Sequence, residues 1–96
     1  MKVNNINGTS SNACKCGAWL DHWKKFSDQS LPTYCPEVKC LQKPEVGAHV
    51  QKDGSNDNNW YIVPFCKTHN GEKGKSLDIS DNIKLVSANV SETCGK

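Results

Sequence analysis

Hydrophobic residues recur at helical spacing in one segment near the start of the chain. Residues 18–27 read AWLDHWKKFS, with apolar side chains at Trp19, Leu20, Trp23 and Phe26. Apolar residues three or four positions apart lie on one face of a helix, and here Asp21, Lys24 and Lys25 fall on the opposite face. The pattern predicts a short amphipathic helix that buries both tryptophans in the core.

Two later segments have the composition of β-strands. Residues 46–52 (VGAHVQK) and 60–65 (WYIVPF) are rich in β-branched and aromatic side chains, and the polar stretch DGSNDNN separates them. Strand-like runs joined by turn-forming residues indicate a hairpin, here over residues 46–65. Further strands are expected in 76–80 and 83–90, joined by a turn at Asp81 and Asn82. About one helical turn fits between Cys66 and the glycines that follow it.

The rest of the chain lacks regular patterns. Residues 30–47 contain three prolines and predict an irregular loop. Residues 1–13 are polar and rich in Asn, Ser and Gly, so we expect a disordered tail there. Residues 14–96 then form one domain of the small α+β class, held together by metal.

The composition indicates that disulfide bonds or bound metal stabilise the fold. A 96-residue chain with 35% hydrophobic residues builds a modest core, and this one has six cysteines: Cys14, Cys16, Cys35, Cys40, Cys66 and Cys94. The first residues show no export signal and no run is long enough to span a membrane, so we expect a cytoplasmic protein that does not associate with membranes. Disulfides are rare in that compartment, which favours metal thiolates over three disulfides in a secreted protein.

The cysteine spacing predicts a zinc site. Cys35 and Cys40 form one pair, Cys66 and His69 form a second, and a hairpin-sized segment separates them. Structural zinc is usually held by four such ligands arranged as two short-spaced pairs. A rival assignment gives Cys16 to this zinc in place of one cysteine of the first pair.

A second metal site is a further hypothesis. Cys14 and Cys16 are too close in sequence to form an unstrained disulfide with each other, but both can bind one metal. If the chain ends meet, Cys94 adds a third ligand, with His22 or His49 as the fourth. For His22, its place beside Trp23 on the predicted helix favours a solvent-facing or capping role over that of a ligand.

The stretch CPEVKC…VGAHV…WYIVPFCKTHN, within residues 35–74, resembles the treble-clef core of HNH-type (ββα-metal) endonucleases. The segments outside it resemble small bacterial proteins of unassigned function. The resemblance implies that Cys35, Cys40, Cys66 and His69 bind a structural zinc. It places His49 where the family has its general base. Asn70 falls where the family commonly has a histidine that binds the catalytic ion.

Two positions depart from the HNH pattern. Ala48 stands where the family has an acidic residue or histidine, and Asn70 replaces the metal-binding histidine. A hydrolytic site needs an ion to hold the scissile phosphate, so these changes favour a binding module over an enzyme. A metal-dependent endonuclease with His49 as base is the alternative. His49 has two further alternatives, a hydrogen-bonded core residue or a ligand of the second metal.

Charge adds little support for a nucleic-acid partner. The net charge is +2, and the chain contains no arginine, the usual reader of guanine and phosphate. No phosphate-binding glycine loop and no catalytic triad pattern is present. The sequence thus predicts a monomeric zinc module that binds nucleic acid or a protein, with no small-molecule organic cofactor.

Overall fold

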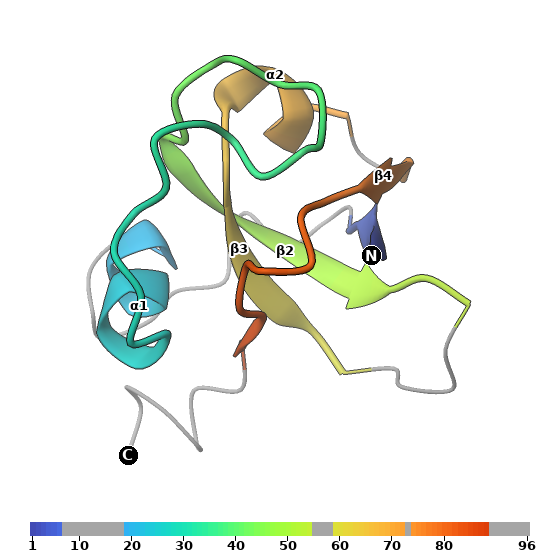
Figure 1. The fold of residues 1–96 in the computed structure, drawn as a ribbon. Helices are drawn as coiled ribbons and strands as arrows, with labels where there is room; N and C mark the ends of the chain where they lie inside the picture. Colours follow the sequence, from blue (N-terminus) through green and yellow to red (C-terminus); the bar gives the residue numbers. More distant parts are fainter. Residues whose placement is uncertain (7–18, 55–58, 73, 89–96) are drawn as a thin grey trace.

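The fold is a five-stranded antiparallel sheet with one helix against a face and a helical turn at one end (Figure 1). A computed structural model describes residues 1–6, 19–54, 59–72 and 74–88. The strands lie in the order β4-β1-β2-β3-β5. In chain order the elements are β1 (Lys2–Asn5), α1 (Trp19–Phe26), β2 (Val46–Lys52), β3 (Tyr61–Phe65), α2 (Lys67–Asn70), β4 (Ser76–Asp78) and β5 (Val86–Ser87). This confirms the α+β class.

The predicted hairpin is confirmed and forms the centre of the sheet. β2 and β3 pair antiparallel, with Ala48 opposite Val63 and His49 opposite Ile62. Because side chains alternate along a strand, the first pair points to one face of the sheet and the second pair to the other. Of the expected tip, residues 55–58 lie outside the described residues.

Each face of the sheet carries its own core. We call the first the cysteine face; its buried residues are Val3, Cys35, Ala48, Val50, Val63, Phe65, Cys66 and Ile79. The second, the helix face, has a smaller buried set of Trp23, Ile62 and Val86, with Trp19 and Phe26 packed beside it. α1 covers this second face, and the long loop before β2 passes from there to the cysteine face.

Helix α1 follows the predicted apolar spacing. Trp23 is completely buried, and its Nε1 donates a hydrogen bond to the Lys84 carbonyl oxygen at 2.8 Å, whereas Trp19 is only partly buried. The helix ends where Asp28 adopts a φ of 56°, a left-handed conformation that stops helical hydrogen bonding. Neither helix in the described part of the chain is long and apolar enough to cross a membrane.

Strand β1 contradicts the expected disordered tail over its first residues. β1 lies between β4 and β2, with Val3 opposite both Leu77 and Lys52. Val3 and Asn5 are almost completely buried. The prediction of residues 1–13 as a disordered tail was therefore wrong for residues 2–5. A single apolar residue among polar ones does not indicate a strand, and the strands that pair with β1 lie far along the chain. Residues 7–13 lie outside the described residues.

The last two strands are shorter than predicted and do not pair with each other. β4 pairs with β1 at one edge of the sheet, and β5 pairs with β3 at the other. Between them Ile79 packs into the core of the cysteine face. The turn at Asp81 and Asn82 is present, but it belongs to a segment that runs from one edge of the sheet to the other instead of a hairpin. β4 and β5 pair at these edges because β1 and β3 offer unpaired backbone groups there.

Candidate metal centre

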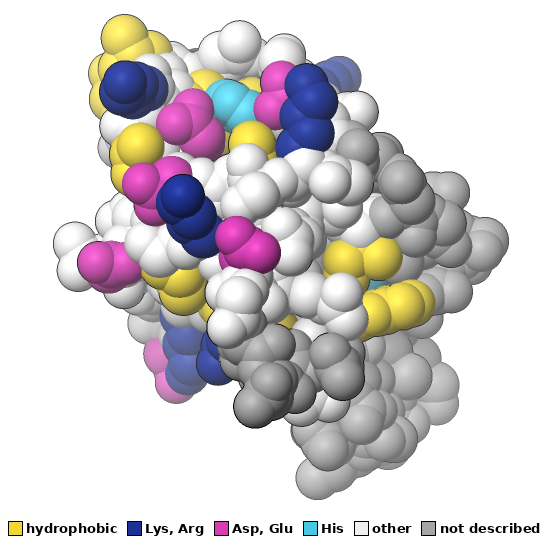
Figure 2. Space-filling model, turned by 90° about the vertical axis from the view of Figure 1, so that its right-hand side faces the viewer, with side chains coloured by type: hydrophobic (Ala, Val, Ile, Leu, Met, Phe, Trp, Pro, Cys, Tyr) yellow, Lys and Arg dark blue, Asp and Glu magenta, His cyan; other side chains and the backbone are white. Residues whose placement is uncertain are grey.

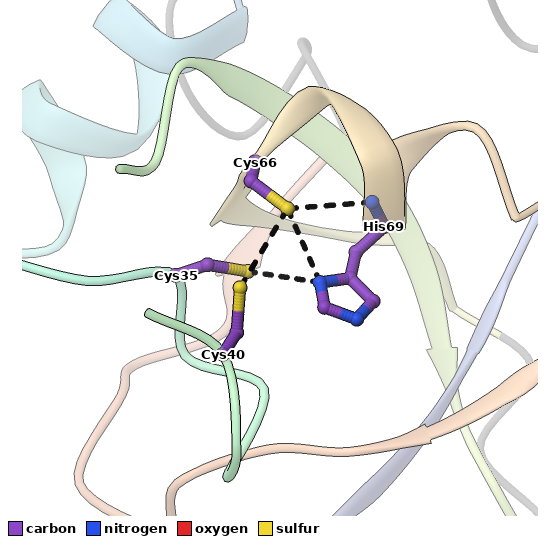
Figure 3. Close-up of side chains that lie close together, drawn as sticks. All are labelled: Cys35, Cys40, Cys66 and His69. Atoms are coloured by element: carbon purple, nitrogen blue, oxygen red, sulfur yellow. Dashed lines mark hydrogen bonds between the residues drawn. The ribbon is translucent and has the colours of Figure 1, made fainter. Parts of the chain in front are cut away.

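Three cysteines and a histidine converge at one end of the cysteine face (Figure 3). One ligand atom each from Cys35, Cys40, Cys66 and His69 lies within 4.8 Å of all the others. Cys35 and Cys40 come from the loop before β2, Cys66 follows β3, and His69 is on α2. The two pairs predicted from spacing are therefore brought together, and Cys35 and Cys40 both take part.

A tight turn in the loop aligns the first pair. The backbone N–H of Cys40 donates to the Glu37 carbonyl oxygen at 3.0 Å, which turns the chain back between the two cysteines. The N–H of Cys35 donates to the Gln42 oxygen at 2.8 Å, and the Gln42 N–H donates to Cys40 Sγ at 3.4 Å. These bonds close the loop, so that both sulfurs point to the same side.

Helical geometry aligns the second pair. Cys66 is the N-cap of α2, and its Sγ accepts a hydrogen bond from the His69 backbone N–H at 3.4 Å. Residues three apart lie on one face of a helical turn, which places Cys66 Sγ 3.2 Å from His69 Nδ1. Cys66 therefore both begins the helix and faces the centre.

Two of the distances match the edges of a tetrahedral zinc site, while Cys66 Sγ and His69 Nδ1, at 3.2 Å, are closer together. Zinc bonds of about 2.3 Å to sulfur and about 2.0 Å to nitrogen imply edges of about 3.8 Å between sulfurs and about 3.6 Å between sulfur and nitrogen. The Cys40 and Cys66 sulfurs are 3.8 Å apart, and Cys35 Sγ lies 3.6 Å from His69 Nδ1. The three described cysteines are free thiols. The donor set and its spacing suit a metal ion, and a Cys₃His set is typical of structural zinc.

The surroundings of Cys35 keep its thiol protonated unless a cation is bound. Burial raises the pKa of the Cys35 thiol to about 12, against the opposing effect of backbone N–H groups of Cys66 and Glu37. The neighbouring Cys66 sulfur raises that pKa further. A thiolate is therefore unfavourable here without compensating positive charge, and a bound metal ion supplies that charge and deprotonates its thiol ligands.

Asn5 supports the centre and was missed in the sequence. Its Nδ2 donates hydrogen bonds to the carbonyl oxygens of His69 at 2.9 Å and Asn70 at 3.0 Å. These are terminal carbonyls of α2, and the His69 oxygen also accepts a hydrogen bond from the Glu72 N–H at 3.1 Å. β1 thereby ties the helical turn that carries a ligand to the middle of the sheet. An asparagine in a polar stretch has no local signal for this role.

The structure places His49 away from the four ligands. Its side chain is 5% exposed and lies on the helix face, edge-on to the Trp19 ring at 4.6 Å and the Trp60 ring at 6.2 Å between centroids. Apart from the Cys₃His cluster, the described residues contain no group of three or more His, Cys, Asp or Glu side chains placed to hold a metal ion.

The predicted second metal site lies largely beyond the described residues. Cys14, Cys16 and Cys94 are all outside them, so neither this site nor the rival use of Cys16 is tested. His22 was expected to face solvent or cap the helix, and that is wrong. It is fully buried, with Nε2 2.8 Å from the backbone oxygen of Ser87 in β5, a contact that depends on how α1 packs against the sheet.

Beside the metal centre the surface is hollowed. An open hollow of about 510 Å³ lies between the loop before β2 and the turn at 80–83. Its lining includes apolar side chains of Tyr34, Val38, Leu41 and Ile83 and the polar groups of Ser80 and Asn82. The loop that supplies Cys35 and Cys40 therefore also forms one wall of a surface depression.

The chain matches no known family model, no curated protein and no solved structure. The HNH resemblance therefore rests on the motif residues alone, and the geometry of the centre stands as independent evidence for a metal site.

Proposed function

We propose that this chain is a small zinc-binding module with an HNH-like core, in which zinc is structural and the loop that it holds binds a protein partner. The observation that carries this proposal is the convergence of four ligand atoms within 4.8 Å from three separate segments. A single ion there cross-links the loop, the end of β3 and α2.

The ligand count favours a structural role for zinc. Four protein ligands complete tetrahedral coordination, whereas catalytic zinc keeps one position open for water. Cys35 and Cys66 are buried, and both belong to the core of the cysteine face. The ion would therefore replace hydrophobic contacts that a core of this size lacks.

The order of elements supports a treble-clef-like description. A cysteine turn, the β2–β3 hairpin and a helical turn with two ligands follow one another along the chain. The position that would serve as general base, His49, is nevertheless buried between two tryptophan rings. A general base must reach the proton it removes, so this arrangement favours binding over hydrolysis.

The exposed side chains favour a protein partner over nucleic acid. Among the described residues, the exposed large hydrophobic side chains are Leu31, Tyr34, Val38, Leu41 and Trp60, and all but Trp60 lie on the metal-bound loop. Apolar and aromatic side chains are typical of the centre of protein interfaces. Among the described side chains on the face shown in Figure 2, basic and acidic groups are interspersed and form no continuous basic patch for a phosphate backbone.

Metal content tests the first part of the proposal. We expect protein purified under reducing conditions to hold at least one zinc per chain by native mass spectrometry. Cys66→Ser should lose one equivalent, and Cys16→Ser should keep the zinc of this centre. Folded wild-type protein with less than half a zinc per chain would refute the proposal.

Site-specific crosslinking tests the second part. A photoreactive residue at Leu41 should capture a partner only in zinc-loaded protein, and capture should fail when Tyr34→Ala and Val38→Ala are added. Trp60→Ala, a large exposed hydrophobic outside the loop, is the matched control and should leave capture intact. Tight binding of labelled DNA or RNA that persists at physiological salt would instead indicate a nucleic-acid partner.

A further inference from the structure

The second ring nitrogen of His69 has its own partner. Nδ1 faces the cysteine sulfurs, and Nε2 lies 3.2 Å from Oε2 of Glu37 on the opposite side of the ring. Both side chains are largely buried, with 16% of His69 and 18% of Glu37 exposed. The imidazole is therefore held between the thiol cluster and a carboxylate.

The Glu37 carboxylate is held in place by the backbone around it. Its Oε1 accepts a hydrogen bond from the Lys39 N–H at 3.0 Å, so each oxygen faces a different nitrogen. Glu37 also forms an isolated bridge with Ile79, and the Val38 N–H donates to the Asp78 oxygen at 3.1 Å. These contacts do not involve the ligand sulfurs, and they hold the carboxylate in place on the side of the His69 ring opposite the cluster.

We propose that Glu37 is a positioning residue for the metal centre, acting through His69. By accepting a hydrogen bond from the protonated Nε2, it selects the tautomer that leaves the Nδ1 lone pair for the metal and fixes the plane of the ring. A carboxylate or carbonyl on the second nitrogen commonly plays this part for histidine ligands. The inference rests on the proposed zinc site and adds an outer residue that determines its affinity.

Another ion pair in the loop region provides the contrast. Glu45 lies 3.5 Å from Lys67 Nζ, and the two side chains are 50% and 78% exposed. Exposed pairs of this kind contribute little to stability or geometry. Glu45→Gln therefore removes a carboxylate near α2 without touching a ligand, which makes it a matched control.

We expect zinc affinity to fall about 10-fold in Glu37→Gln and up to about 100-fold in Glu37→Ala, the range for loss of such partners. The Gln side chain retains one acceptor oxygen, but its NH₂ group must face either the Lys39 N–H or the His69 Nε2–H. Glu37→Gln therefore keeps only part of the contact. Glu45→Gln should bind zinc as tightly as wild type. Affinity would be measured by competition with a chromophoric chelator.

A double-mutant cycle separates orientation of the ring from general electrostatics. In a His69→Cys background no imidazole remains to be oriented, so Glu37→Gln should no longer lower zinc affinity. An equal loss in both backgrounds would overturn the inference. As a second readout, the His69 Nε2–H proton should be visible by NMR in the zinc-loaded wild type and lost through exchange in Glu37→Ala. A His69 Nε2–H signal that persists in Glu37→Ala would also contradict the inference.

The outcome for Glu37 is distinguishable from that for the centre itself. If wild-type protein binds no zinc, the proposed function fails. If wild type binds zinc and both Glu37 variants bind it equally tightly, only the role of Glu37 is refuted.

Discussion

At the residue scale, buried polar side chains connect the sheet to the metal centre. Asn5 is 1% exposed and is on a strand that pairs with β2 and β4, yet its side chain binds carbonyl oxygens of the helix that carries His69. Loss of this buried amide removes two hydrogen bonds to the end of α2, and the His69 oxygen keeps only its bond from the Glu72 N–H.

We therefore expect Asn5→Ala to lower the free energy of unfolding by about 2 kcal/mol and to weaken zinc binding. Asn4→Ala is the control, since Asn4 is on the same strand and bonds only the exposed carboxylate of Asp53 at 3.2 Å. Chemical denaturation of both variants in the presence of zinc would measure the difference. Equal stability of the two variants would contradict a supporting role for Asn5.

At the same scale, the surroundings of His49 lead to a prediction about activity. Its ring is enclosed by tryptophans, so we expect no metal-dependent nicking of plasmid DNA with added magnesium or manganese. The matched comparison is His49→Ala, which should show the same background as wild type. Nicking that survives purification and disappears in His49→Ala, with zinc and fold retained, would establish the endonuclease alternative.

At the element scale, α1 packs with its backbone against β2. A β-carbon placed on Gly47 would lie 2.4 Å from the Trp19 carbonyl carbon and 2.5 Å from the Leu20 nitrogen. Backbone atoms cannot yield as a flexible side chain can, so the absence of a side chain at Gly47 determines how closely the helix approaches the sheet.

Gly47→Ala should consequently displace α1 and destabilise the protein by about 2 to 3 kcal/mol, as expected for overpacking. Gly71→Ala is the control: its φ of −75° suits alanine, and the nearest atoms would be 3.4 Å away. That variant should change stability by less than about 1 kcal/mol. Thermal unfolding followed by tryptophan fluorescence would report the stability of both variants. An unchanged stability of Gly47→Ala would refute the close contact.

At the scale of the whole molecule, the candidate metal centre joins the loop before β2 to the end of a small sheet. The loop before β2 has no regular structure apart from one bridge residue, Glu37; Cys35 belongs to the core and Cys40 packs against it. Structural zinc binding contributes about 10 to 16 kcal/mol in zinc-finger peptides. That range is comparable to the total stability of a typical domain, about 5 to 15 kcal/mol.

Removal of zinc is therefore expected to unfold the protein. A strong chelator should abolish the near-ultraviolet circular dichroism of the buried tryptophan and expose Cys35, Cys40 and Cys66 to a thiol reagent. Re-addition of zinc under reducing conditions should restore both signals. A chelated protein that keeps its tertiary signal would show that the hydrophobic core alone suffices.

Local patterns in the sequence were sufficient for α1, the central hairpin and the proximity of Cys66 to His69. The helix follows from the 3.6-residue apolar period, and the hairpin follows from two β-rich runs around a turn. Cys66 and His69 are three residues apart on a helical turn, so their proximity is also a local property. Residue type and short spacing determine such features because the interacting groups are close along the chain.

Only the tertiary structure decided which distant segments meet. β1 and β4 are paired although more than 70 residues separate Lys2 from Asp78, and β4 and β5 lie on opposite edges of the sheet. The burial of His22 and His49, the support from Asn5 and the contact between Glu37 and His69 likewise depend on those pairings. Backbone hydrogen bonds between strands are nearly independent of residue type, so the sequence alone does not specify their partners.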